Sequence, residues 1–272
     1  MNSSFVMEFN SCIEKRPMAR SHKGILNSIW MKVNGASMHA RRSENSVPPT
    51  ALTVVLVHGL SVSSGYMVPT AMRLAPYHHV YLPDLPGFGK SAKPSHVLTI
   101  PELADALADW MQAMGLPPAV LLGNSLGCQI IVNFALKYPE RLTHAVLVGP
   151  TMDPQARSIH QAALRLLLDI PCEPLPFLPV LVREYLAAGP RRTIRTLQHA
   201  FADRMEAHLP SVQTPTLIVR GARDPIVRQE WTEQVHQLLP ESQLVVVRGA
   251  GHAVNFNAPE KLVRTVQSFL SQ

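Results

Sequence analysis

The chain has 272 residues, of which 46% are hydrophobic, and its formal net charge is +6. This length can bury one large core and fits a single α/β domain that carries an inserted subdomain. The charge does not indicate nucleic-acid binding, because residues 1–42 hold seven Lys/Arg and two Glu and leave the rest of the chain almost neutral. We therefore expect a flexible, basic N-terminal extension over residues 1–24 and no nucleic-acid partner.

Membrane and secreted proteins are also disfavoured. No stretch reaches the roughly 18 uncharged apolar residues of a membrane span, and Glu8 interrupts the short apolar run near the N-terminus. The three cysteines, Cys12, Cys128 and Cys172, have no metal-ligand or redox spacing. We expect reduced thiols, a cytoplasmic location and no stable membrane insertion, and the sequence leaves the oligomeric state open.

The first expected elements form a β-hairpin and then a parallel sheet. SIWMKV and SMHAR flank Asn34-Gly35, a strong signal for a two-residue hairpin turn, so the ordered domain should open near Ile25. The runs LTVVLV, VYLPDLPG, AVLLG and HAVLVGP are rich in Val and Leu without alternation. That pattern is typical of parallel strands buried on both faces.

Helical patterns separate these strands. In residues 99–115, Thr99 and Glu102 match a capping box and Gly115 ends the helix. Alternating strands and helices predict a mostly parallel, doubly wound α/β sheet.

The alternation stops after Pro150. Residues 151–212 contain helical stretches at 158–170 and 191–209, divided by a proline-dense run, and no strand-like run. Strand and helix patterns resume from residue 213 to the end. We therefore expect a core made of residues 25–150 and 213–272, with residues 151–212 inserted as a helical cap.

The stretch GNSLG carries the clearest chemistry. Gly123-Asn124-Ser125-Leu126-Gly127 fits G-x-S-x-G, follows the strand AVLLG and precedes a helical pattern. In that context the serine lies at a strained strand-to-helix turn with its Oγ exposed, and the helix N-terminus favours a developing oxyanion. The pattern predicts that Ser125 is a nucleophile rather than a residue of an ordinary glycine turn.

A serine nucleophile needs a base and a group that orients the base. Asp224 follows the strand TLIVR and His252 follows the strand LVVVR, so both should reach the same sheet edge as Ser125. We predict His252 as the base and Asp224 as the acid. Asp153 is the substitute acid, and His58 is a rival histidine that we interpret as shaping a loop.

Two backbone N–H groups should form the oxyanion hole. One should belong to Leu126, directly after the nucleophile. The other should come from the loop after LTVVLV, where Leu60 is the first choice and Ser61 the second.

The chain resembles the α/β-hydrolase superfamily in six segments that follow one another in the family's order. They are HGLS at 58–61, PDLPGFGKS at 83–91, GNSLG at 123–127, KYPERLTHAVLVGP at 137–150, RGARDPIV at 220–227 and GAGHAVNFNAPE at 249–260. The resemblance covers residue 28 to the end. It implies that PDLPGFGKS shapes one wall near the active site. Haloalkane dehalogenases and epoxide hydrolases of this fold carry Asp at the elbow, so Ser125 is not typical of them.

The cap should roof the substrate pocket. Its leucine-rich stretches predict an apolar acyl or alcohol group, with Leu168 and Phe177 from the cap and Ser61 from the core as substrate-binding residues. Most cap leucines could equally pack on the core. Arg191, Arg192 and Arg195 could meet a carboxylate, but a solvated, internally paired face is the interpretation that the cap's charge balance favours.

The predicted function is a serine esterase that cleaves small-molecule carboxylic esters through an acyl-enzyme, without a metal or an organic cofactor. One alternative is a hydrolase that cleaves C–C bonds of ring-cleavage diketones. The C–C enzymes share the GNS opening, but they usually carry glycine where Cys128 stands and an aromatic residue where Ala253 stands. The second alternative is a ligand-binding receptor on the same fold.

Overall fold

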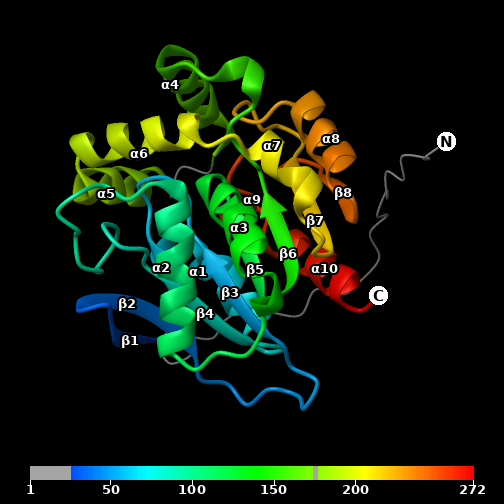
Figure 1. Cartoon of the computed structure of the whole chain (residues 1–272). Helices are drawn as coiled ribbons and strands as arrows, with labels where there is room; N and C mark the ends of the chain where they lie inside the picture. The colour runs from blue at the N-terminus through cyan, green and yellow to red at the C-terminus, as the bar shows by residue number, and fades with distance from the viewer. Residues whose placement is uncertain (1–25, 174–176) are drawn as a thin grey trace.

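The computed structural model describes residues 26–173 and 177–272 (Figure 1). The expected basic extension, residues 1–24, lies outside the described residues. Within the residues that the structure describes, eight strands form one sheet in the order β1-β2-β4-β3-β5-β6-β7-β8. Their bounds are β1 Leu26–Val33, β2 Ala36–Ser43, β3 Thr53–Val57, β4 His79–Pro83, β5 Ala119–Asn124, β6 Leu142–Val148, β7 Thr216–Gly221 and β8 Ser242–Val247.

The sheet is mostly parallel, as the sequence predicts. β2 pairs antiparallel with β1 and β4, and every other neighbouring pair is parallel. β1 and β2 form the expected hairpin, in which Val33 pairs with Ala36. Asn34 and Gly35 both have positive φ, 48° and 80°, as a type I′ turn requires.

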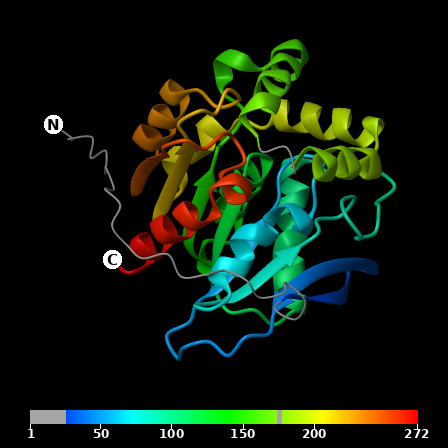
Figure 2. The same ribbon diagram turned by 180° about the vertical axis from the view of Figure 1, so that it is seen from behind.

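Helices cover both faces of the sheet (Figures 1 and 2). One face carries α2 (Ile100–Ala113), α3 (Leu126–Lys137) and α8 (Gln229–Leu238), and the other carries α1 (Ser64–Leu74), α9 (Val254–Asn257) and α10 (Pro259–Leu270). Two separate clusters of buried apolar side chains fill these two layers. The capping box of Thr99 and Glu102 is present at the start of α2.

The described part of the segment between β6 and β7 holds four α-helices: α4 (Ile159–Asp169), α5 (Phe177–Ala188), α6 (Pro190–Ala202) and α7 (Met205–His208). Short 3₁₀ turns, Pro154–Ala156, Ile170–Cys172 and Leu209–Ser211, accompany them. In Figure 1 they lie together beyond the ends of β6 and β7. We call them the inserted helices.

Two details of this segment differ from the expectation. The helical stretch expected over 191–209 is divided between α6 and α7, because the buried Asp203 leaves the helix and accepts hydrogen bonds from the side chains of Gln129 and Asn133. In addition, α5 begins inside the proline-dense run and continues to Ala188, where no separate helix was expected. Pro179 stands in its first turn, where a missing N–H costs little.

Within the described parts of the chain, no helix is long and apolar enough to cross a membrane.

The segment PDLPGFGKS is organised by the carboxylate of Asp84. Its Oδ1 accepts the N–H of Ser64 at 2.7 Å, and its Oδ2 accepts the N–H of Lys90 at 2.9 Å and lies 2.8 Å from Nδ1 of His39. Burial opposes ionisation, but these hydrogen bonds outweigh it and hold the pKa of Asp84 well below its usual range. A side chain at Gly89, whose φ is 52°, would collide with this carboxylate.

We predict that Asp84→Ala lowers the free energy of unfolding by at least about 3 kcal/mol, because the N–H groups of Ser64 and Lys90 and the ring of His39 lose one buried, charged acceptor. Urea unfolding followed by circular dichroism measures this change. Glu140→Ala, on an exposed residue of the same chain, should change it by less than about 0.5 kcal/mol. Equal effects of the two substitutions would contradict the role given to Asp84.

Candidate active site

Ser125 alone joins the end of β5 to the start of α3. Its backbone has φ 57° and ψ −118°, a conformation that costs a non-glycine residue about 1–3 kcal/mol. The N–H of Ser125 donates to the carbonyl of Val148 at 2.9 Å, which ties the turn to the end of β6. The structure therefore places this serine on a sharp, strained strand-to-helix turn.

The glycines of GNSLG are required by close backbone packing. A Cβ on Gly123 would lie 2.6 Å from the carbonyl carbon of Gly127, and a Cβ on Gly127 would lie 2.5 Å from the carbonyl oxygen of Val57. Either distance is far below van der Waals contact. β5, α3 and β3 can thus approach one another only when both positions are glycine.

Cys128 lies beneath this turn and not in the cavity beside it. Its buried thiol points to the carbonyl oxygens of Gly123 and Val148, at 3.4 Å from each. Burial raises the pKa of the Cys128 thiol, so it stays protonated. Cys128 and Cys172 are both free thiols, whereas Cys12 lies outside the described residues.

Asp224 and His252 meet at the carboxyl edge of the sheet. Nδ1 of His252 lies 2.8 Å from Oδ2 of Asp224. The other oxygen, Oδ1, accepts the backbone N–H groups of Ile226 and Val227 at 2.8 and 2.9 Å. Both oxygens of the buried carboxylate are occupied, so its orientation toward the ring is fixed.

The electrostatic surroundings of His252 favour its cation. Burial of the ring opposes protonation, but the charge and hydrogen bond of Asp224, together with the charges of Asp169 and Glu173, raise the pKa of His252 to about 9. Nε2 is buried and has no hydrogen-bond partner among the described residues. Nε2 of His252 therefore makes no hydrogen bond to Ser125.

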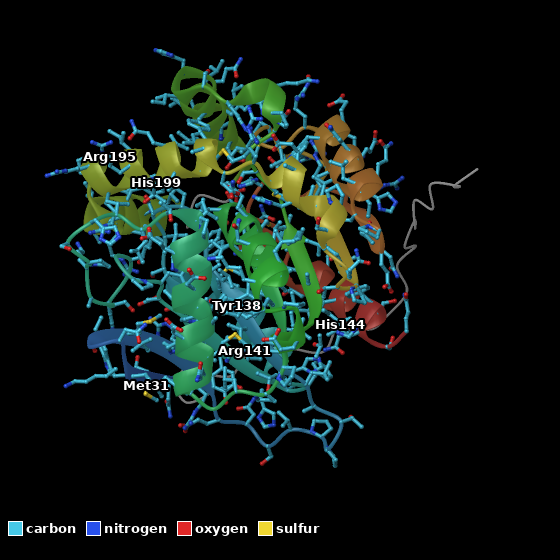
Figure 3. All side chains as sticks on the ribbon, viewed as in Figure 1. Met31, Tyr138, Arg141, His144, Arg195 and His199 are labelled. Atoms are coloured by element: carbon cyan, nitrogen blue, oxygen red, sulfur yellow. The ribbon has the colours of Figure 1, made fainter. Side chains whose placement is uncertain are left out.

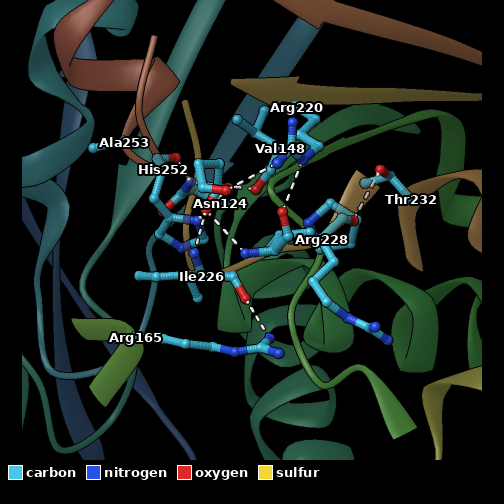
Figure 4. Close-up of polar contacts among 12 residues, drawn as sticks. Asn124, Val148, Arg165, Arg220, Ile226, Arg228, Thr232, His252 and Ala253 are labelled. Carbon is cyan, nitrogen blue, oxygen red and sulfur yellow. Dashed lines mark hydrogen bonds and ion pairs between the residues drawn. The ribbon is translucent and has the colours of Figure 1, made fainter. Parts of the chain in front are cut away.

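Asn124 connects the turn to the histidine loop. Its Nδ2 donates to the carbonyls of Val148 and His252 at 3.2 and 3.3 Å, and its Oδ1 accepts the hydroxyl of Tyr66 at 2.9 Å. Figure 4 shows Asn124 between Val148 and His252. Sequence reasoning missed this role, because the middle positions of G-x-S-x-G are unrestricted in the pattern.

A cavity of about 120 Å³ lies against these groups. It is bounded by Ser125 and His252, by the two expected oxyanion-hole residues Leu60 and Leu126, and by apolar side chains of the inserted helices. The apolar side chains include Leu166, Leu181, Leu197 and Phe201. Leu60, Ser125 with its neighbour Leu126, and His252 come from three distant segments and thus border one space.

Two of the three expected substrate-binding residues, Leu168 and Ser61, lie outside the cavity lining. Leu168 is 52% exposed and lies outside the cavity, because successive side chains of a helix point in different directions and Leu166 and Asp169 take the inward positions on α4. Ser61 is buried outside the cavity lining, and its hydroxyl lies 2.7 Å from that of Thr193. Phe177 begins α5, but its side chain lies outside the described residues.

The three arginines considered for a carboxylate, Arg191, Arg192 and Arg195, also lie away from the cavity. Arg195 points outward from α6 (Figure 3) and donates to Gln198 at 3.2 Å. Arg191 is exposed, and Arg192 donates to the carbonyl of Pro94. Arg165 does line the cavity, and its guanidinium donates to the carbonyl of Ile226 at 2.8 Å (Figure 4).

His58 and Asp153, the alternative histidine and acid, form hydrogen bonds away from Ser125. His58 lies 2.9 Å from the carbonyl of Gly59 through Nδ1 and accepts the N–H of Leu85 through Nε2, so it joins two loops. The carboxylate of Asp153 accepts the N–H of Gln155 and the Nε–H of Arg228. Neither contacts the serine through a hydrogen bond.

Comparisons with known proteins agree with this architecture. The carboxylesterase YbfK of Bacillus subtilis (strain 168) is 27% identical over 245 residues, which cover 83% of this chain and 82% of that protein. Lipase 3 of Moraxella sp. (strain TA144) is 26% identical over 248 residues, covering 81% and 78%. The crystal structure of the carboxylesterase CesB (YbfK) from Bacillus subtilis matches with a TM-score of 0.73 at 25% identity, over 90% of this chain and 91% of that one.

The family model described as "Alpha/beta hydrolase family" matches residues 54–265. This range runs from β3 to α10 and includes the turn at Ser125, Asp224 and His252. The chain therefore belongs to the alpha/beta hydrolase family.

Proposed function

We propose that the protein is a serine hydrolase that cleaves carboxylic esters through an acyl-enzyme. One observation carries this proposal: Ser125, on a strained turn, borders the same cavity as His252, whose Nδ1 is hydrogen-bonded to the fixed carboxylate of Asp224. The similarity to a carboxylesterase and a lipase supports the choice of an ester bond.

In the proposed mechanism, Oγ of Ser125 attacks the ester carbonyl while Nε2 of His252 takes the hydroxyl proton. Asp224 keeps the ring in the tautomer with a free Nε2 and stabilises the imidazolium that forms. The N–H groups of Leu60 and Leu126 hold the oxyanion. His252 then protonates the leaving alcohol, and water activated by His252 releases the acid and regenerates Ser125.

The inserted helices act in this proposal as a cap over the pocket. Leu166, Leu181 and Leu197 give its roof an apolar surface next to Ser125. Such a surface suits an alkyl acyl or alcohol group better than a charged one. The proposed substrates are therefore small esters with an apolar group on one side.

The C–C hydrolase alternative uses the same three residues on a vinylogous diketone. Ala253, which stands where those enzymes usually carry an aromatic residue, borders the cavity, so this departure changes the pocket itself. Assaying ring-cleavage diketones beside simple esters separates the two activities. A ligand-binding receptor would instead gain thermal stability from its ligand without consuming it.

Ser125→Ala should lower kcat/KM for a short p-nitrophenyl ester by roughly ten-thousandfold or more, because the covalent route is lost. The far-UV circular dichroism spectrum should be unchanged. Ser268→Ala, on the exposed side of α10, is the control and should retain full turnover. Undiminished turnover by Ser125→Ala would remove this serine from the mechanism.

The pH dependence of kcat/KM should report the ionisation of His252. The ring must be neutral to accept a proton, and its surroundings raise its pKa above the ordinary value of 6.5. The rate should therefore increase with pH, with the midpoint of the acid limb above 6.5. A midpoint at or below 6.5, measured at constant ionic strength, would contradict the electrostatic account.

Leu166→Phe should narrow the pocket. We expect it to reduce kcat/KM for p-nitrophenyl octanoate at least about tenfold more than for the acetate, because the longer acyl chain needs the space. Leu168→Phe is the matched control, since residue 168 is on the same helix but outside the cavity. The octanoate-to-acetate ratio of this control should stay within about twofold of wild type. The same loss in both variants would refute the proposed placement of the acyl chain.

A further inference from the structure

A carboxylate of the inserted helices lies against the histidine loop. Glu173 follows the 3₁₀ turn Ile170–Cys172 and is 7% exposed. Its Oε1 accepts the N–H of Ala253 at 2.8 Å, and its Oε2 accepts the side-chain amide of Asn257 at 3.0 Å. Glu173 therefore binds the backbone directly after His252 and the end of α9.

The chain passes close to this carboxylate on the other side of His252 as well. A Cβ on Gly251 would lie 2.8 Å from Oε1 of Glu173 and 3.0 Å from the carbonyl oxygen of Cys172. Glycine at 251 thus permits a contact between the inserted helices and the histidine loop that a side chain would block.

The two sides of the histidine loop are held from different parts of the fold. Asn124, in the core, donates to the carbonyl of His252, whereas Glu173, in the inserted segment, accepts the N–H of Ala253. The peptide unit that joins His252 to Ala253 is therefore hydrogen-bonded at its oxygen and at its nitrogen. This fixes the backbone from which the imidazole projects.

We infer that Glu173 is a positioning residue: it holds the His252 loop from the inserted helices and supplies negative charge that stabilises the imidazolium. The inference rests on the proposed function, in which His252 is the base. Through Glu173, the packing of the inserted helices on the core affects the orientation of the catalytic base.

Several charged and titratable groups share this region. Asp169 lies one helical turn before Glu173, and Asp224 contacts the ring directly. Cys172, Tyr66 and Tyr185 also interact electrostatically with these acidic groups, and Arg223 interacts with Cys172. Burial and the neighbouring Asp169 raise the pKa of Glu173 to about 7, although the N–H of Ala253 opposes this shift.

Glu173→Gln separates the charge of this residue from its hydrogen bonds. The amide oxygen can still accept the N–H of Ala253. The amide nitrogen would face Nδ2 of Asn257, so it can donate to Oδ1 of Asn257 once that side-chain amide turns over. Glu173→Ala removes both the charge and the hydrogen bonds. Glu206→Gln is the control, because Glu206 lies on α7 and pairs with Arg157 instead.

For Glu173→Ala we expect kcat for p-nitrophenyl butyrate to fall about tenfold or more, with KM within about threefold of wild type, because orientation of the base is lost while the pocket persists. For Glu173→Gln we expect kcat at the alkaline plateau to stay within about threefold. Its acid limb should move to lower pH by about half a unit or more, because the imidazolium loses a stabilising charge. Glu206→Gln should match wild type in both measurements.

NMR titration of the His252 ring, in the Ser125→Ala background with and without Glu173→Gln, measures the same shift without any turnover. The titration tests only the role of Glu173, whereas the proposed function is tested separately by the turnover of Ser125→Ala. Full ester turnover by Ser125→Ala would refute the proposed function and would leave the titration result unaffected. An unchanged His252 titration in Glu173→Gln would overturn the inference. So would a wild-type kcat in Glu173→Ala. If Glu173→Ala does not fold, the pKa of His252 measured in the isosteric Glu173→Gln variant decides whether the inference holds.

Discussion

The strained backbone at Ser125 is the constraint on which the site depends. A non-glycine residue holds φ 57° there only because the surrounding packing over-determines the turn. Gly123 and Gly127 let β5, α3 and β3 approach closely, and the carbonyl of Val148 binds the serine N–H. The result is a serine side chain presented at the carboxyl edge of the sheet, directly before the N-terminus of α3.

The histidine loop is the second element, and it is held by hydrogen bonds from three segments. Asp224 binds the ring, Asn124 binds the carbonyl of His252, and Glu173 binds the next N–H. Two of these residues belong to the core and one to the inserted segment. In our proposal the inserted helices therefore do more than enclose the pocket, because they also help to set the orientation and charge of the base.

Sequence patterns predicted the features that depend on local backbone rules. The hairpin at Asn34-Gly35, the capping box of α2 and the parallel strands follow from turn chemistry, capping and apolar runs, and the structure confirms them. The convergence of Asp224 and His252 follows from one topological rule, that parallel strands end at a common edge.

Features set by contacts between distant segments were not predictable in this way. The break after α6 depends on hydrogen bonds from Gln129 and Asn133 on α3 to the carboxylate of Asp203, and the local sequence does not predict that contact. Leu166 and Leu168 are the same residue type two positions apart, and only the way in which α4 packs on the core decides which of them faces the cavity. Glu173 lies in a proline-dense run without periodicity, so its partners appear only once the chain is folded.

The central claim is that Ser125 is a nucleophile activated by His252. Mass spectrometry after treatment with a fluorophosphonate tests it most directly, because this reagent marks activated serines covalently. The account predicts one adduct per chain, located on the peptide that contains Ser125, with far slower labelling in His252→Ala. An adduct on another residue, or ester turnover that continues in protein fully labelled at Ser125, would contradict it.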